Sequence, residues 1–195
     1  MQVAVDAVVF TVLEHDLKLL LIKRKKEPYK GKYALPGGFV NNEEDAYNAA
    51  KRELTEETGL QNIFLKQLKA YTKPERDPRG RVISIAYLAL ISPDQDLHAA
   101  TDALSAEWIS TLKIPSVAFD HKEIIEDALE QLRFEIQTTN IAVQILPEKF
   151  TLTELQQLYE YVLGKELDKR NFRKKVKELN IIREAAGTKM EGAHR

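Results

Sequence analysis

The chain has 195 residues and no cysteine, with 44% apolar residues, 30% charged residues and a formal net charge of −1. This length allows one large domain or one domain with a small appendage, and the lack of cysteine excludes disulfides, thiolate zinc sites and a cysteine nucleophile. No apolar run approaches the roughly 20 residues of a membrane span. Because the start of the chain also lacks the basic lead of a signal peptide, we expect a cytoplasmic protein without a membrane partner.

The first part of the chain predicts a β-hairpin. Residues 3–12 and 17–23 are rich in apolar and β-branched side chains, and a polar turn at 14–16 separates them. Further along, Gly37 and Gly38 predict a tight turn in which other atoms can approach the backbone closely.

A helix is predicted between this turn and Gly59. Asn41 or Asn42 can cap its start, and the acidic residues 43–45 would lie in its first turn, where the helix dipole favours negative charge. Gly59 provides a left-handed stop. The buried stripe expected from the helical spacing consists of Ala46, Ala49, Ala50 and Leu54.

Three glutamates on this helix point to a cation site. Glu53, Glu56 and Glu57 stand at i, i+3 and i+4, so their carboxylates project from one face and repel one another. A hard divalent cation with oxygen ligands would compensate for that repulsion. The alternative is a solvated acidic face, which is common on helices of this composition.

The spacing around the helix resembles the signature of the Nudix (MutT-like) hydrolases at every fixed position. Gly38 is followed after five residues by Glu44, and after seven more by the run RELTEETGL at 52–60. The resemblance covers roughly the first two-thirds of the chain.

This resemblance implies an α/β fold, the Nudix α/β/α sandwich with a mixed sheet. It also implies a metal-dependent pyrophosphohydrolase that acts on a nucleoside diphosphate linked to another group, with Mg²⁺ or Mn²⁺ as cofactor. The implied metal ligands are Gly38, through its carbonyl, and Glu53, Glu56 and Glu57. The implied catalytic cluster comprises Glu44, Arg52, Glu53, Glu56 and Glu57, in which Arg52 can fix a carboxylate by an ion pair.

A loop at 72–80 is predicted between strands at 63–71 and 81–91. Its sequence RDPRGR resembles that of Nudix enzymes acting on ADP-ribose, and Arg76 or Arg79 can hold a phosphate bidentately. A surface loop whose arginines meet only water is an equal alternative. Glu75 or Asp77 can supply a carboxylate that activates water, and the sequence does not choose between these two residues.

The end of this first domain predicts one more strand and one helix. Ala106 to Ile109 resembles a strand of many Nudix domains, so Trp108 is expected in the core. A helix at 121–134 follows, with His121 as a residue of the helix start and not a catalyst. The sequence FDH at 119–121 resembles members of the family that act on ADP-ribose.

A second domain is expected after residue 139, so that a Nudix domain spans 1–139 and a small C-terminal domain spans 140–195. After a polar turn and a short strand in 137–147, helices are predicted at 150–164 and 168–179. A strand at 181–183 and a turn at 187–195 complete the order of a winged helix-turn-helix. Since only one wing strand is evident, the wing is either incomplete or differently folded.

The second helix of this domain is the predicted DNA-binding element. Seven Lys or Arg residues stand against two acidic residues between Lys165 and Lys177, and the segment resembles the C-terminal domain of Nudix-related transcriptional regulators. A solvated basic helix packed on the Nudix domain is the alternative. The predicted phosphate contacts are Lys169, Arg170, Arg173, Lys174 and Lys177, and Asn171 is expected to reach a base edge.

Two functions compete on these grounds. The first is a Mg²⁺-dependent Nudix hydrolase, with ADP-ribose as the favoured substrate, fused to a DNA-binding domain. The second is a transcriptional regulator whose Nudix domain senses ADP-ribose, a related nucleotide or a sugar without significant hydrolysis. The presence of all the glutamates favours hydrolysis. A homodimer is expected, because twofold symmetry would present two basic helices to palindromic double-stranded DNA.

Overall fold

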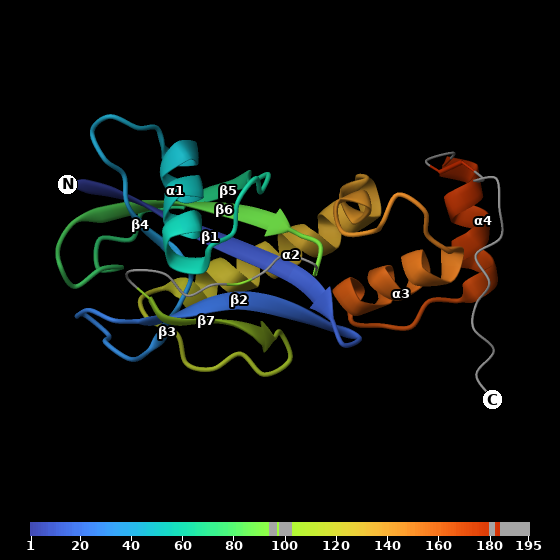
Figure 1. Ribbon diagram of the computed structural model, residues 1–195, viewed down its shortest axis with the longest axis horizontal. Helices are drawn as coiled ribbons and strands as arrows, with labels where there is room; N and C mark the ends of the chain where they lie inside the picture. The colour runs from blue at the N-terminus through green and yellow to red at the C-terminus, as the bar shows by residue number, and fades with distance from the viewer. Residues whose placement is uncertain (94–96, 98–102, 180–181, 184–195) are drawn as a thin grey trace.

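The computed structural model describes residues 1–93, 97, 103–179 and 182–183, and these form a mixed seven-stranded sheet with four α-helices and one short 3₁₀-helix (Figure 1). The central path of the sheet has the order β3-β2-β1-β6-β5, while β4 pairs with β1 and β7 pairs with β2. Strands β1 and β6 are parallel and the other pairs are antiparallel. The strands are β1 (Gln2–Leu13), β2 (Asp16–Arg24), β3 (Tyr33–Ala34), β4 (Gly37–Phe39), β5 (Lys66–Tyr71), β6 (Val82–Leu90) and β7 (Ala103–Ser110).

Helices α1 (Ala46–Thr58) and α2 (His121–Thr138) cover opposite faces of the sheet (Figure 1). Side chains of a strand alternate between its two faces, and β1 is apolar on both. Val5 and Ala7 belong to the apolar cluster that contains the buried side of α1. Val8 and Phe10 belong to the cluster under α2. The expected α/β/α sandwich with a mixed sheet is therefore confirmed.

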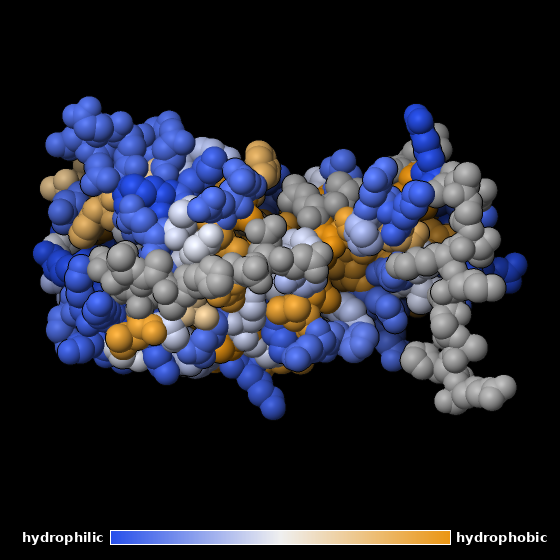
Figure 2. Space-filling view, viewed as in Figure 1, coloured by the Kyte–Doolittle hydropathy of each residue, from blue (hydrophilic) through white to orange (hydrophobic). Residues whose placement is uncertain are grey.

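The C-terminal helices extend the cluster under α2. The short helix η1 (Ile141–Gln144) leads to α3 (Leu152–Leu163) and α4 (Lys169–Leu179), which lie together at one end of the molecule (Figure 1). Leu132 of α2 packs in one apolar cluster with residues of α3 and α4. In Figure 2, apolar surface gathers in the middle of the molecule, and hydrophilic surface covers the end that carries α1. The residues contributed to the cluster by α3 and α4 are Leu155, Leu158, Val162, Phe172 and Val176.

Several element boundaries differ from the sequence-based expectation. Helix α1 begins after Asp45, whose carboxylate accepts a hydrogen bond from the Asn48 N–H (2.8 Å), and not after Asn41 or Asn42. Asn41 instead donates its N–H to Glu44 (3.0 Å), so residues 41–44 form a turn that presents Glu44 to the helix.

In the C-terminal region, η1 replaces the short strand expected before Pro147. Residues 182 and 183 are not in a strand, and the other residues of the predicted wing lie outside the described part of the chain. Within the described residues, no helix is long and apolar enough to cross a membrane.

Candidate functional site: an arginine-centred carboxylate cluster and a basic helix

Arg52 organises the glutamates predicted from the sequence. Its Nη1 donates to Glu53 Oε1 (2.7 Å) and to Glu56 Oε2 (3.3 Å), while Nε and Nη2 donate to the Glu44 carboxylate at 2.6–3.2 Å. Nη2 also donates to the backbone carbonyl of Phe39 (3.1 Å), which fixes the guanidinium between α1 and β4. The hydrogen bonds from Arg52, together with the one from the Asn41 backbone, lower the pKa of Glu44 to about 2.

Glu53 lies between Arg52 and the backbone of Gly38. Burial raises the pKa of the Glu53 carboxyl, Arg52 opposes this, and the neighbouring charges of Glu56 and Glu44 add to the rise. A Cβ on Gly38 would overlap the Glu53 carboxylate. The sequence therefore needs glycine at this position so that the carboxylate can lie against the strand.

Glu57 is directed to β4. It is 7% exposed, and its Oε2 accepts the Gly37 N–H (2.8 Å). The three glutamates therefore lie on one side of α1 but have different partners. Glu53 and Glu56 accept hydrogen bonds from Arg52, and Glu57 accepts one from the glycine turn. Among the described residues, no three acidic, histidine or cysteine side chains converge closely enough to form a ready-made metal ligand set.

The residues nevertheless fit a divalent cation. Carboxylates are hard oxygen donors, and the second oxygens of Glu53 and Glu56 accept no hydrogen bond from the described residues. A cation near Glu53 would favour the charged form of its carboxyl and so oppose the rise in pKa that burial causes. Because Gly38 has no side chain, the Glu53 carboxylate fits beside the strand. A Cβ at position 38 would occupy the same space.

A pocket of about 480 Å³ lies between the 72–80 loop and the start of α2. Arg79 connects this pocket to the carboxylate cluster through two aromatic residues. Its guanidinium lies 4.7 Å from the ring centroid of Phe39, whose carbonyl binds Arg52, and 5.4 Å from that of Phe119, which lines the pocket. Arg24 lies 4.8 Å from the Phe119 ring, so two cations flank one aromatic side chain. The side chains that line the pocket include Tyr29, Lys73, Arg76, Phe119, Asp120 and Glu123.

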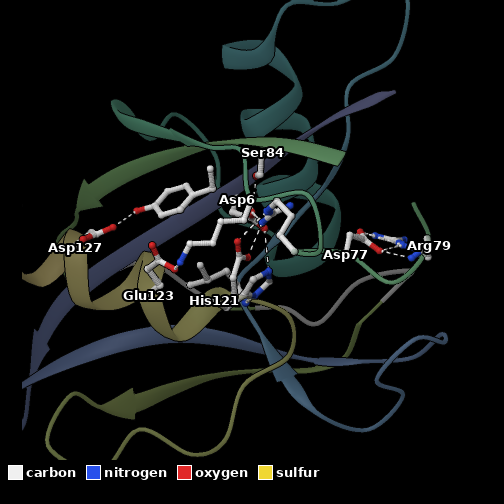
Figure 3. A network of polar contacts seen from close by, with 12 residues as sticks. Asp6, Asp77, Arg79, Ser84, His121, Glu123 and Asp127 are labelled. Atoms are coloured by element: carbon white, nitrogen blue, oxygen red, sulfur yellow. Dashed lines mark hydrogen bonds and ion pairs between the residues drawn. The ribbon is translucent and has the colours of Figure 1, made fainter. Parts of the chain in front are cut away.

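The two arginines predicted to hold phosphate have different surroundings. The Arg79 side chain is 39% exposed, and it is held by Asp77 through Nε and Nη2 (Figure 3). The Arg76 side chain is only 3% exposed, and its Nε and Nη2 donate to the Asp120 carboxylate at 2.9 and 2.7 Å. Arg79 is therefore free to meet a ligand on its exposed side, whereas Arg76 lies in the floor of the pocket.

The two acidic residues of the same loop also differ. Burial raises the pKa of Asp77, but the hydrogen bonds from Arg79 outweigh this and hold it below its ordinary value. Glu75 is exposed and lines the pocket. A role in activating water stays a prediction for either residue.

Sequence reasoning missed the aromatic and basic wall of the pocket. Tyr29 and Phe119, which line the pocket, are single aromatic residues in loops. Arg24, which packs on Phe119, belongs to a basic run that is typical of a solvated strand end. His121 begins α2, as expected, and it is buried, with its Nδ1 accepting the Leu35 N–H (2.9 Å). Trp108 packs against the cluster under α1, as expected for a core residue.

The described part of α4 has one apolar and one basic face. Phe172 and Val176 are buried against the rest of the protein. Arg173 is half-buried, and its Nε is enclosed without a partner among the described residues. The remaining predicted DNA contacts are exposed, and they are Lys169, Arg170, Asn171, Lys174 and Lys177.

The structure thus combines a mixed sheet between two helices, glutamates gathered on α1 and basic residues exposed on α4. A family model described as the NUDIX domain matches residues 2–128, and one described as the NrtR DNA-binding winged helix domain matches residues 142–195. The chain belongs to the Nudix family and carries a C-terminal winged helix domain.

Its relatives include both regulators and enzymes. Over 96% of its length, the chain is 35% identical to the "ADPR responsive transcriptional repressor NtrR" of Acinetobacter baylyi, of which it covers 77%. Over 64% of its length, it is 46% identical to an "ADP-ribose pyrophosphatase" of Methanocaldococcus jannaschii, of which it covers 71%. A crystal structure of Shewanella oneidensis NrtR complexed with a 27mer DNA is similar with a TM-score of 0.78 and 30% identity, over 98% of this chain and 89% of that one.

Proposed function

We propose that the Nudix domain of this chain binds ADP-ribose and hydrolyses its diphosphate, and that the winged helix domain binds double-stranded DNA. The observation that carries the hydrolytic part is the retention of all the glutamates around Arg52, with Glu53 seated against a glycine that leaves it room. The names of the two relatives support ADP-ribose as the ligand, and one of them is an enzyme.

The proposed cofactor is Mg²⁺ or Mn²⁺, held by Glu53, Glu56 and Glu57 together with the carbonyl of Gly38. When bound, such a cation neutralises charge on a diphosphate and lowers the pKa of a coordinated water. Arg52 orients the carboxylates of Glu53 and Glu56 through Nη1, so it is the residue that sets the spacing of the site.

Arg79 is the proposed contact to the diphosphate. Its guanidinium is partly exposed and lies between the rings of Phe39 and Phe119, at the boundary between the carboxylate cluster and the pocket. A guanidinium presents a planar fork of donors that matches phosphate oxygens. Arg76, the other predicted phosphate contact, is the less favoured of the two, because its side chain is 3% exposed and its Nε and Nη2 both donate to Asp120.

Hydrolysis is tested by the release of AMP and ribose 5-phosphate from ADP-ribose in the presence of Mg²⁺. Glu56→Gln is the informative variant, because the side chain is 50% exposed and its loss leaves no buried charge. We expect about a 100-fold loss of turnover with an unchanged melting temperature. Glu130→Gln, which changes an exposed glutamate on α2, is the matched control and should retain full activity. Equal turnover by both variants would exclude the proposed metal site.

The alternative is a regulator that binds ADP-ribose without hydrolysing it. It is favoured by the hydrogen bonds through which Arg52 engages one oxygen of Glu53 and one of Glu56, because these two oxygens are then not available to a cation. A chain that binds ADP-ribose calorimetrically but releases no AMP with Mg²⁺ or Mn²⁺ would establish this alternative.

DNA binding is proposed for the exposed basic face of α4, with phosphate contacts from lysine and arginine and a base contact from Asn171. A homodimer would match a palindromic site. The proposed location is the cytoplasm. Fluorescence anisotropy with a labelled duplex at several salt concentrations tests the contact, and sedimentation of the full chain tests the dimer. Affinity that does not change with salt would exclude phosphate contacts by α4.

A further inference from the structure

A buried polar network lies beneath the pocket. Its centre is Asp6 of β1, which is 6% exposed. The Asp6 carboxylate accepts hydrogen bonds from Ser84 Oγ and from Arg76 Nη2 (3.3 Å), and Figure 3 shows Asp6 between Ser84 and His121. Three segments far apart in the sequence therefore meet at one carboxylate.

His121 contributes a third hydrogen bond to Asp6. Because its Nδ1 accepts the N–H of Leu35, the proton of the neutral ring lies on Nε2. Nε2 is 3.3 Å from Asp6 Oδ1 and donates to it. The network thereby also reaches the segment that leads into the glycine turn of the carboxylate cluster.

Arg76 connects Asp6 to Asp120 at the start of α2. Its two bonds to Asp120, at 2.9 and 2.7 Å, form a bidentate pair. Asp120 precedes the first residue of α2 and belongs to a residue type that commonly caps helices. Its side chain makes no capping hydrogen bond here, because it is directed to Arg76.

The residue before Asp120 has a strained backbone. Phe119 has φ of +53°, and Tyr29, whose ring meets that of Phe119 edge-on at 4.9 Å, has φ of +65°. Left-handed geometry is rare for bulky side chains, and it persists where the surrounding structure fixes it. The aromatic wall of the pocket is thus built from two residues that need external support.

We propose that Asp6, Arg76 and Asp120 form a positioning network that holds Phe119 and the 72–80 loop as one wall of the ligand pocket. Asp120 fixes the backbone next to Phe119, and Arg76 ties the loop that carries Arg79 to the same carboxylate. Arg76 then acts through Asp120, and its contribution to binding does not require contact with the ligand. This inference rests on the proposed function, since it takes ADP-ribose as the ligand.

The test uses the full chain and measures ADP-ribose affinity by calorimetry in EDTA, where no turnover occurs. Asp120→Asn removes the bidentate pair but leaves the charges of Arg76 and Asp6 balanced, so folding is retained. We expect affinity to fall about 10- to 100-fold, because misplacement of a contact by about 1 Å has effects of this size. Mn²⁺ affinity should stay unchanged, since the carboxylates of α1 are not altered.

Asp127→Asn is the matched control. Asp127 lies on the same helix and accepts hydrogen bonds from Tyr71 (2.7 Å) and Lys69 (2.6 Å), outside the pocket lining (Figure 3). We expect this variant to lose stability and to keep the affinity of the unaltered chain. Equal affinities for the Asp120→Asn variant and the unaltered chain would overturn the inference.

A double-mutant cycle separates positioning from direct contact. If Arg76 acts through Asp120, the Arg76→Lys substitution weakens binding alone but adds no further loss in the Asp120→Asn background. A further tenfold loss in the double variant would show that Arg76 touches the ligand and would overturn the positioning role. If the unaltered chain binds no ADP-ribose, the proposed function fails first and this inference fails with it.

Discussion

Adjacent glycines give a sharp test of the carboxylate cluster. The atoms nearest to a methyl group on Gly38 would be those at the end of the Glu53 side chain, which can rotate away. A methyl group on Gly37 would overlap the Val5 carbonyl and approach the Asp6 backbone at 3.0 Å, and these atoms cannot move without opening the pairing of β4 with β1. The same substitution is therefore predicted to affect the function at one position and the fold at the next.

The expected magnitudes follow from this difference. Gly37→Ala should destabilise the fold by about 1–3 kcal/mol, as overpacking does, and lower the melting temperature by about 2–12 °C for a chain of this length. Gly38→Ala should change stability by less than about 1 kcal/mol. Because it displaces Glu53, it should reduce turnover of ADP-ribose about 100-fold, equivalent to about 2.7 kcal/mol in the transition state.

The assays are calorimetric melting of both variants and AMP release at saturating Mg²⁺. A Gly38→Ala variant that hydrolyses ADP-ribose at the unaltered rate would refute the placement of Glu53 in the site. A Gly37→Ala variant with an unchanged melting temperature would refute the close packing of β4 on β1.

Three further predictions concern DNA affinity, the core and pH. Lys174→Gln should lower DNA affinity for all sequences and reduce the salt slope by about 0.9, while Lys122→Gln on α2 should leave the anisotropy titration unchanged. Leu158→Ala, at a position 3% exposed, should destabilise the chain by about 2–4 kcal/mol and lower the melting temperature by about 4–16 °C in a single calorimetric transition. Since Arg52 lowers the pKa of Glu44 from 4.5 to about 2, the folded state gains stability from this group above pH 4.5 and loses it as pH falls toward 2. Urea titrations should therefore show the stability difference between the unaltered chain and Glu44→Gln shrinking over that range, and a constant difference would contradict the ion pair.

The sequence predicted best those elements whose apolar, glycine or charged residues recur at a fixed spacing. The hairpin, the glycine turn, both helices of the sandwich and the basic helix were predictable because each depends on local periodicity and end signals. The ion pair of Arg52 with Glu56 was predictable for the same reason, since residues four apart on a helix are neighbours.

The pocket was not predictable, because its residues come from separate segments. Nothing local to Asp6, Arg76 or Asp120 indicates that they meet. For Arg76 the sequence left a phosphate contact and a solvated surface residue as equal alternatives, and neither includes a buried pair with Asp120. The cap of α1 was misplaced for a related reason. Glu44 is needed by Arg52, so the chain turns once more before Asp45 begins the helix.

Helix α2 has a consequence for how the two family segments can be separated. It starts at the pocket, at His121, and over its 18 residues extends roughly 27 Å to the apolar cluster that contains α3 and α4. The segment that connects the two matched regions packs against the protein, because its residues Ile141 and Ile145 are buried. Cutting the chain between the matched regions would expose buried apolar side chains on both fragments. We therefore expect that neither fragment folds stably when it is moved to another protein.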